Sequence, residues 1–335
     1  MRSSPLVIVK VSAKLPALAG GVACAVALLL PCSASFAQNY PTKPIKLVLA
    51  QPPGGATDLF ARLLTQKMGE SMGQPVIIDH KPGANNMIAN QTVAAAPKDG
   101  YTLLIGTTAL GLNPIMYKKL NYKVEDFAPI SVIALPAFSM SINKSLPTKS
   151  LKEFIDYVKA RPGKINYGTL GRGSTGHLLG KMFEESAGLD MLDIPYKGAA
   201  AALSALVAGD VQVYFDSITT SIPQLRAGAI NVIGVTSEAR VPTAPDVPTL
   251  KEQGLPMVAT SWFGVLAPAG TPRPIILKLN REIQAAVAWP EYQSRLNAAG
   301  ATPASSASPE EFAAMIQNMT ELWGRIPRKL GMSFD

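Results

Sequence analysis

Thiols and imidazoles are scarce in this chain. Its two cysteines, Cys24 and Cys32, fall within the first 37 residues, and its two histidines, His80 and His177, stand far apart. A dedicated transition-metal site needs several such ligands at short spacings, and no H-E-x-x-H pattern is present. We therefore predict no metal and no cofactor. No pair of carboxylates stands out as an acid and base, so the pattern does not favour an enzyme.

Long apolar runs are also missing, except near the start. Residues 1–37 have the three parts of a secretory signal peptide: basic residues, an apolar stretch over 15–30, and a small residue, Ala37, at the cleavage site. The basic residues are Arg2, Lys10 and Lys14. Beyond this segment no run reaches 18 apolar residues, so we predict an exported, soluble protein whose mature chain begins at Gln38.

Charge of either sign is sparse. The full chain carries a formal charge of +8, and the signal segment holds three basic and no acidic residues, which leaves +5 for the rest. There is no dense basic run with interleaved aromatic residues, so nucleic-acid binding is not expected. A mildly positive field suits an anionic ligand, and it is equally compatible with an ordinary solvated surface.

Strand and helix patterns alternate along most of the chain. Short β-branched runs such as 45–50, 75–79 and 101–106 are each followed by a turn and a helical pattern, which predicts βαβ units, a parallel sheet and an α/β fold. Further strands are expected at 130–135, 138–142, 165–168, 192–195, 211–215, 231–235 and 262–267, and further helices at 151–160, 175–187, 199–208, 274–288, 291–299 and 309–326. The length after residue 37 suits two lobes. We predict that residues 38–137 with 260–335 form the first lobe and residues 138–259 the second.

The strongest motif is the turn Pro52–Asp58 between a predicted strand and helix. The start of a helix has unpaired N–H groups and a positive dipole end, and glycines let a ligand approach the backbone closely. Gly54, Gly55, Ala56, Thr57 and Asp58 therefore form a candidate anion site. The alternative is a plain tight turn in which Thr57 or Asp58 caps the helix.

A second Gly-rich turn, Thr169–His177, has the same design. Gly173, Ser174 and Thr175 could hold a carboxylate at the start of the next helix, and Arg172 could add a charged hydrogen bond or simply be an exposed loop arginine. Ser174 does not sit in a G-x-S-x-G frame, which argues against a nucleophile elbow. A hydrolase that uses Ser174 with His177 is an alternative function of a different class.

Polar residues also end two other predicted strands. Thr107 and Thr108 follow the strand at 101–106 and could bind a carboxylate oxygen directly or through water, or they could cap a helix. Asp216 ends the strand at 211–215. It suits a ligand ammonium or hydroxyl, or it caps the next helix.

Eight short motifs occur in an order that resembles the Bug receptors, the substrate-binding proteins of tripartite tricarboxylate transporters. The motifs are PPGG with TD at 52–58, KPGA at 81–84, DGYTL at 99–103, DFAP at 126–129, KINYG at 164–168, PYKG at 195–198, DVPT at 246–249 and SWFG at 261–264. The resemblance extends over nearly all of the chain after residue 37. Each motif alone is weak, whereas the ordered set is specific.

The resemblance implies a two-lobed periplasmic binding protein (type II-like), each lobe a βα sandwich, which closes on a small carboxylate in the cleft between its lobes. It implies that a membrane transporter accepts the ligand, and it leaves a sensor kinase as an alternative partner. A monomer is expected. The implied ligand-binding residues are Gly54, Gly55, Ala56, Thr57, Asp58, Thr107, Thr108, Gly173, Ser174, Thr175 and Asp216.

Several positions depart from the family pattern. Gln51 stands where an aromatic residue is frequent, His80 where asparagine is common, and Asn85-Asn86 where Gly-Gly is common. Arg172 replaces a small or polar residue. These changes concern the identity of the ligand and leave the expected fold unaltered.

Overall fold

The structure is a computed structural model that describes residues 40–334. The predicted signal peptide, residues 1–37, lies outside the described residues. From Pro41 onward the chain forms one compact unit. Among residues 40–334, no helix combines the length and the apolar character that crossing a bilayer requires.

Two β-sheets organise this unit, and the first has six strands. In spatial order they are β11 (Ala301–Pro303), β4 (Phe127–Pro136), β10 (Phe263–Pro268), β3 (Thr102–Thr107), β1 (Ile45–Leu49) and β2 (Val76–His80). Strands β1, β2 and β3 are parallel, as the βαβ pattern predicts. Strand β10 is antiparallel to β3 and β4, and β11 is antiparallel to β4. The prediction of a parallel sheet is therefore wrong for β10 and β11. Strand β10 runs opposite to β4 because the chain leaves the first sheet after β4 and returns to it at β10.

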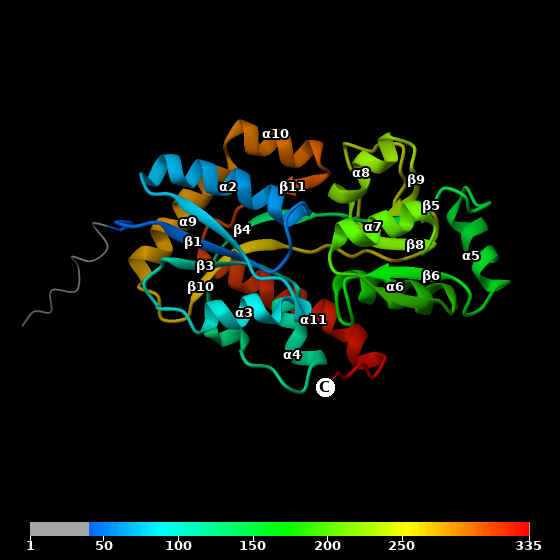
Figure 1. Cartoon of the computed structure of the whole chain (residues 1–335), viewed down its shortest axis with the longest axis horizontal. Helices are drawn as coiled ribbons and strands as arrows, with labels where there is room; N and C mark the ends of the chain where they lie inside the picture. Colours follow the sequence, from blue (N-terminus) through cyan, green and yellow to red (C-terminus); the bar gives the residue numbers. More distant parts are fainter. Residues whose placement is uncertain (1–39, 335) are drawn as a thin grey trace, which may run out of the picture. The chain divides into compact units, whose positions relative to one another are not determined.

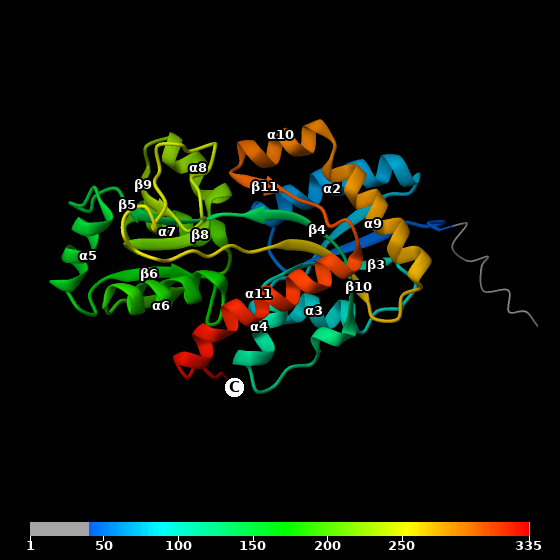
Figure 2. The same ribbon diagram turned by 180° about the vertical axis from the view of Figure 1, so that it is seen from behind.

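Helices cover both faces of the first sheet (Figures 1 and 2). On one face lie α2 (Ala56–Met72), α9 (Arg273–Val287) and α10 (Pro290–Ala298), and on the other lie α3 (Met87–Ala94), α4 (Ala109–Met116) and α11 (Pro309–Lys329). The strands between these layers are almost continuously apolar. Leu47, Val48, Leu104 and Val265, for example, are each at most 1% exposed, as expected for strands covered on both sides.

The second sheet has five strands. In spatial order they are β7 (Leu192–Pro195), β6 (Asn166–Thr169), β8 (Val213–Ser217), β5 (Phe138–Asn143) and β9 (Ile230–Val235). Strand β6 is parallel to β7 and β8, whereas β5 is antiparallel to β8 and β9. The helices of this region are α5 (Leu151–Lys159), α6 (Thr175–Ala187), α7 (Ala199–Ala208) and α8 (Ile218–Arg226). Figures 1 and 2 place α6 on one face of the sheet, and α7 and α8 on the other.

Three elements escape the sequence patterns. Helices α4 and α8 each contain an internal proline, Pro114 and Pro223, which normally argues against a helix. Strand β11 is only three residues long. The other strands and helices begin and end within a few residues of the predicted ranges.

The chain crosses between the sheets at two adjacent places. Strand β4 ends at Pro136 in the first sheet and β5 begins at Phe138 in the second, so Ala137 is the first crossing. Ala137 pairs in an antiparallel bridge with Thr260, which precedes β10 on the return path. The two crossings therefore lie side by side.

Helix α11 joins the two regions at a third place. Its first half packs Phe312 against Trp262, with ring centroids 5.1 Å apart, under the first sheet. Its second half places Trp323, 1% exposed, against Phe138 at the start of the second sheet. The indole N–H of Trp323 donates a hydrogen bond to the Thr260 carbonyl at the return crossing.

The space around two glycines predicts that substitution by alanine changes the free energy of unfolding in opposite directions. A Cβ at Gly264, in β10, would lie 2.2 Å from the Phe312 ring, so we expect Gly264→Ala to destabilise the fold by about 2–3 kcal/mol. At Gly69, in the interior of α2, the nearest atom would lie 3.6 Å away. Gly69→Ala should therefore stabilise the fold by up to about 1 kcal/mol. Urea unfolding of both variants tests this, and equal effects of one sign would contradict it.

Candidate functional site

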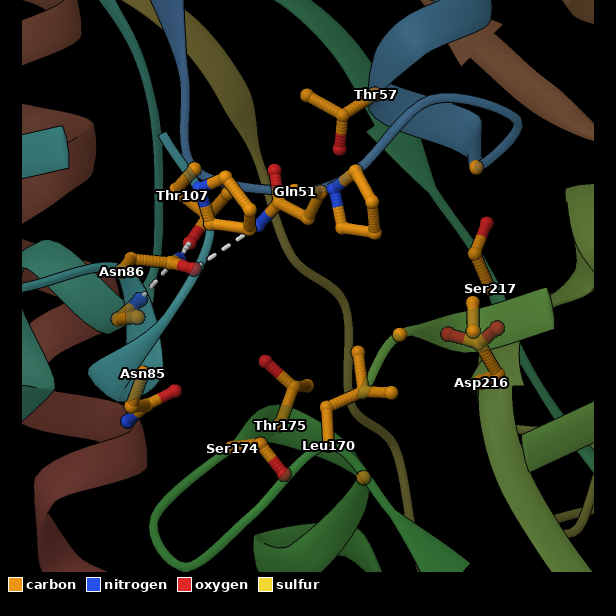
Figure 3. A pocket seen from close by; sticks show the side chains of 18 of the residues that line it. Gln51, Thr57, Asn85, Asn86, Thr107, Leu170, Ser174, Thr175, Asp216 and Ser217 are labelled. Atoms are coloured by element: carbon orange, nitrogen blue, oxygen red, sulfur yellow. Dashed lines mark hydrogen bonds between the residues drawn. The ribbon is translucent and has the colours of Figure 1, made fainter. Parts of the chain in front are cut away.

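A cavity of about 760 Å³ lies between segments that follow strands of both sheets. The first sheet contributes the segments after β1, β2 and β3, and the second contributes those after β6, β7 and β8 (Figure 3). These are the carboxyl ends of parallel strands, the usual ligand position in open α/β sheets. Phe138, Phe215 and Phe263 supply apolar wall. Lys197 and Asp216 are the charged side chains in its lining.

Helices α2, α6, α7 and α8 are among those that begin at this cavity. Helices α6 and α8 are capped by the hydroxyls of Ser174 and Ser217, which accept hydrogen bonds from the backbone N–H groups of His177 and Thr219. Helices α2 and α7 instead have Gly55 and Gly198 at the N-cap, so no side chain satisfies their first N–H groups. The unsatisfied amides and the positive dipole ends of α2 and α7 favour an anion in the cavity.

The loops before these two uncapped helices touch each other. A Cβ at Gly198, which has φ +112°, would lie 2.9 Å from Cγ of Pro52. Glycine is needed at this position both for its left-handed backbone and for the close approach. The start of α7 is thus held beside the loop that leads into α2.

The wall beside β2 and β3 is lined by amide side chains. Gln51 donates from Nε2 to Oδ1 of Asn86 at 3.0 Å, and Asn86 donates from Nδ2 to the Thr107 hydroxyl oxygen at 3.0 Å (Figure 3). Asn85 exchanges hydrogen bonds with the fully buried Asn113. Figure 3 places this wall opposite Thr175 and Asp216.

Backbone strain is concentrated at the same wall. Ala84, Asn85 and Asn86 have φ values of 46°, 46° and 71°, and they are the only non-glycine residues with positive φ among residues 40–334. Such a conformation costs about 1–2 kcal/mol per residue, less for asparagine. The hydrogen bonds of both asparagine side chains offset this cost and fix the strained turn against the cavity.

Asp58 holds the first loop from outside the cavity lining. Its Oδ2 accepts hydrogen bonds from the Gly54 N–H at 3.1 Å and from Nε of Arg62 at 2.9 Å. His80 places Nε2 3.3 Å from Oδ1 of Asp58, while its Nδ1 lies 2.8 Å from the Gln51 carbonyl. Burial alone raises the pKa of Asp58, but the hydrogen bonds from Arg62 and Gly54 and the nearby positive charges outweigh it and lower the pKa below 3.8.

Asp216 lies in the cavity lining under opposite electrostatic conditions. Burial raises its pKa above 3.8, although the hydrogen bond from Thr220 and the nearby Ser217 backbone N–H and Tyr214 hydroxyl act to lower it. The Thr220 hydroxyl donates to Oδ2 at 2.6 Å. Ionising this carboxyl group therefore carries a free-energy cost, and a hydrogen-bond donor on a ligand would reduce that cost.

Ser174 and His177 do not form a nucleophile and base. The Ser174 hydroxyl accepts the backbone N–H of His177, and Nδ1 of His177 accepts the N–H of Gly173 at 3.0 Å. His177 is 4% exposed, and burial lowers its pKa. Both groups serve the turn that begins α6, so the geometry does not support a hydrolase.

The predicted ligand-binding residues divide into two groups. Those in the cavity lining are Gly55, Thr57, Thr107, Ser174, Thr175 and Asp216. Those outside it are Gly54, Asp58, Thr108, Arg172 and Gly173, while the side chain of Ala56 lies outside what the structure describes. Arg172 is exposed, and its carbonyl accepts a hydrogen bond from the Tyr117 hydroxyl at 2.5 Å. The Thr108 hydroxyl is buried against that of Ser261, which itself lines the cavity.

Sequence reasoning missed two parts of the lining. The start of α7, Gly198 to Ala201, has the same glycine-before-helix pattern as the two turns that were recognised, so the pattern could have identified it. Asn85 and Asn86 were treated only as departures from a family pattern. Their tolerance of left-handed backbone after Pro82-Gly83 was the available clue. Among residues 40–334, no group of three or more His, Cys, Asp or Glu side chains could hold a metal ion.

The Asp58 network predicts an acid-sensitive contribution to stability. The folded-state pKa lies below 3.8, so this contribution is complete above about pH 5 and is lost as the pH falls through the folded-state value. We expect Asp58→Asn to cost about 1–2 kcal/mol at pH 7 and much less at pH 3. Thermal unfolding at both pH values measures this, with the exposed Asp246→Asn as the matched control. A constant cost would contradict the prediction.

Asp216 predicts a pH dependence of stability opposite to that of Asp58. Because its folded-state pKa is raised, the folded state loses stability relative to the unfolded state as the pH rises above the unfolded-state pKa, and this penalty disappears below that value. Without ligand, Asp216→Asn should raise the melting temperature at pH 7 by up to about 3 °C and have less effect near pH 3. A lower melting temperature at pH 7 would show that the ionised carboxylate stabilises the empty cavity.

The chain is similar to known proteins over most of its length. Residues 60–332 match the model of the tripartite tricarboxylate transporter family receptor. The protein BugT of Bordetella pertussis is 34% identical, over 88% of this chain and 91% of BugT. A solved R. palustris protein with adipate is 35% identical, with a TM-score of 0.84 over 87% of this chain and 98% of that one. MatC from Rhodopseudomonas palustris, solved with bound malate, is 31% identical, with a TM-score of 0.81 over 86% and 99%.

The extent of these matches confirms the family that the sequence motifs resemble and the two-lobed binding-protein fold. The matched relatives and solved structures are solute-binding proteins. The chain therefore belongs to the receptor family of the tripartite tricarboxylate transporters, the TctC or Bug solute-binding proteins.

Proposed function

We propose that this protein is a periplasmic receptor that binds a small carboxylate between its two lobes and delivers it to the membrane subunits of a tripartite tricarboxylate transporter. The observation that carries the proposal is the cavity itself. The uncapped starts of α2 and α7 meet there from two different sheets, and each offers N–H groups to an anion. Relatives solved with adipate and with malate support the same class of ligand.

The lobes that we propose are residues 38–137 with 260–335, and residues 138–259. Their boundaries fall at the paired crossings Ala137 and Thr260, which form a short two-stranded connection. Rotation about this connection would separate the loop at Pro52 from Gly198 and open the cavity. A ligand that contacts both lobes would favour the closed state by its greater affinity for it.

Within the cavity, we propose that the carboxylate lies against Gly55 and Thr57 from the first lobe and against Ser174 and Thr175 from the second. Figure 3 places the hydroxyl of Thr175 facing Asn85 and Asn86, while the Ser174 hydroxyl caps α6 as an acceptor and keeps its O–H donor. The donors in these segments are backbone N–H groups and hydroxyls. Such preorganised donors bind an anion without placing a fixed positive charge beside it.

Calorimetry with the chain from Gln38 onward tests the proposal. At least one small mono- or dicarboxylate should bind and raise the melting temperature, since a ligand at 100 times its dissociation constant adds about 2.7 kcal/mol. Small-angle X-ray scattering should show a smaller radius of gyration with that ligand. Thr175→Val should weaken binding about tenfold, the effect of losing one hydrogen bond to a charged group.

Thr302→Val is the matched control, because Thr302 lies exposed in β11 away from the cavity. It should leave affinity unchanged. Failure of every carboxylate to bind, or equal effects of the two threonine substitutions, would argue against the proposed function.

A further inference from the structure

Three side chains on the first-lobe wall of the cavity are joined in a directed row. Gln51 donates to Asn86, Asn86 donates to the hydroxyl oxygen of Thr107, and the Ala109 backbone N–H donates to the same oxygen at 3.3 Å. All three side chains line the cavity. We refer to Gln51, Asn86 and Thr107 as the amide row.

The bonding within the amide row leaves hydrogen-bond donors for a ligand. A carboxamide carries two N–H donors and a hydroxyl carries one O–H donor. Each link uses one donor and occupies the oxygen of Asn86 or Thr107, so each member keeps one unused donor. The oxygen outside the row, Oε1 of Gln51, is fully buried and is directed away from Thr175 in Figure 3.

This conclusion does not depend on which way the amides are turned. If both amides are reversed, Thr107 donates to Asn86 and Asn86 donates to Gln51. The Gln51 NH2 group then occupies the buried position of Oε1, and Asn86 keeps one unused N–H group, while both amide oxygens accept within the row. In either orientation Asn86 keeps an N–H donor for a ligand.

The backbone conformation at residue 86 does not by itself explain why the side chain there is an asparagine. Asn86 has φ 71°, a conformation that glycine adopts at no steric cost. The Asn86 side chain instead connects two other cavity-lining residues that come from different segments, one after β1 and one at the end of β3. Its contacts lie in the ligand cavity and hold the row in a fixed position.

We propose that the amide row determines ligand specificity by receiving an oxygen acceptor, a carboxylate or carbonyl group, at the end of the ligand that faces the first lobe. This rests on the proposed function, since it assumes that a carboxylate ligand occupies the cavity. The row selects acids that carry a second acceptor group and discriminates against acids whose other end is apolar or an ammonium group. A site built to donate hydrogen bonds leaves them unsatisfied when the ligand lacks the acceptor.

A matched series of ligands measures this selectivity. At chain lengths of four, five and six carbons, the probes are the dicarboxylates succinate, glutarate and adipate, the corresponding monocarboxylates, and the corresponding ω-amino acids. At the best length, calorimetry should give the dicarboxylate an affinity at least about tenfold above that of both analogues, since one hydrogen bond to a charged group is at stake. Equal affinity for all three end groups would overturn the proposal.

The decisive variant is Asn86→Asp, which keeps the shape of the side chain and its tolerance of left-handed backbone. It replaces the spare N–H donor with an acceptor and adds a negative charge. The preference should invert, with the dicarboxylate weakened by about 100-fold or more and the ω-amino acid becoming the better ligand. Asn121→Asp adds the same charge at an exposed position outside the cavity and should retain the wild-type preference.

A second variant guards against misfolding of the first. Asn86→Gly accepts φ 71° without strain and removes the side chain, so the preference for the dicarboxylate should fall to within a few fold. An unchanged preference in either folded variant would overturn the role of the amide row while leaving the proposed function intact. If no acid in the series binds the wild-type protein, the proposed function fails together with this inference.

Discussion

The need to satisfy the first N–H groups of its helices shapes the whole binding region. In an isolated lobe, the uncapped starts of α2 and α7 would face only water. The topology instead directs both starts into one cavity, because each helix follows a strand whose carboxyl end lies at the edge facing the other sheet. An anion placed there satisfies groups from both lobes at once. In the function that we propose, ligand binding and lobe closure are one event, driven by the same unsatisfied amides.

Two aspartates show how burial and partners separate otherwise similar carboxyl groups. Asp58 has a positive partner in Arg62 and a histidine, His80, beside it, and it serves as an anchor for the loop before α2. The Asp216 carboxylate accepts a hydrogen bond from the neutral Thr220 hydroxyl, and Asp216 lines the cavity. Charge compensation in the first case stabilises the loop. In the second, incomplete compensation leaves a carboxylate that favours a donor from solution.

Much of the fold was predictable because its periodic patterns are strong. The apolar strands β1 and β3, and the glycine-before-helix turns after β1 and β6, follow directly from local sequence. Helices α4 and α8 were not predictable, since tertiary packing overrides their internal prolines. The antiparallel direction of β10 depends on a connection that spans more than a hundred residues, which local patterns do not encode.

The candidate site was predictable to a lesser degree, for a physical reason. Glycines and helix caps identify backbone donors, so Gly55, Thr57, Ser174 and Thr175 could be proposed from residue types. The amide row depends on side chains that come together from three separate segments. A single sequence gives no indication that Gln51 contacts Asn86 or that Asn86 contacts Thr107. Residues such as Asp58, which hold the loop from behind, resemble ligand-binding residues until their hydrogen bonds are seen.

The first sheet cannot be completed until almost the whole chain has been made. Its strands come from residues 45–136 and 263–303, and α11, which ends at Lys329, packs against both regions. Contacts between residues so far apart in sequence form slowly, because a long loop must close before they contribute any stability. A partly synthesised chain therefore lacks the central strand β10 and has no stable first lobe. The export that residues 1–37 predict would require an unfolded chain, and this late completion would keep the chain unfolded until nearly all of it has been made.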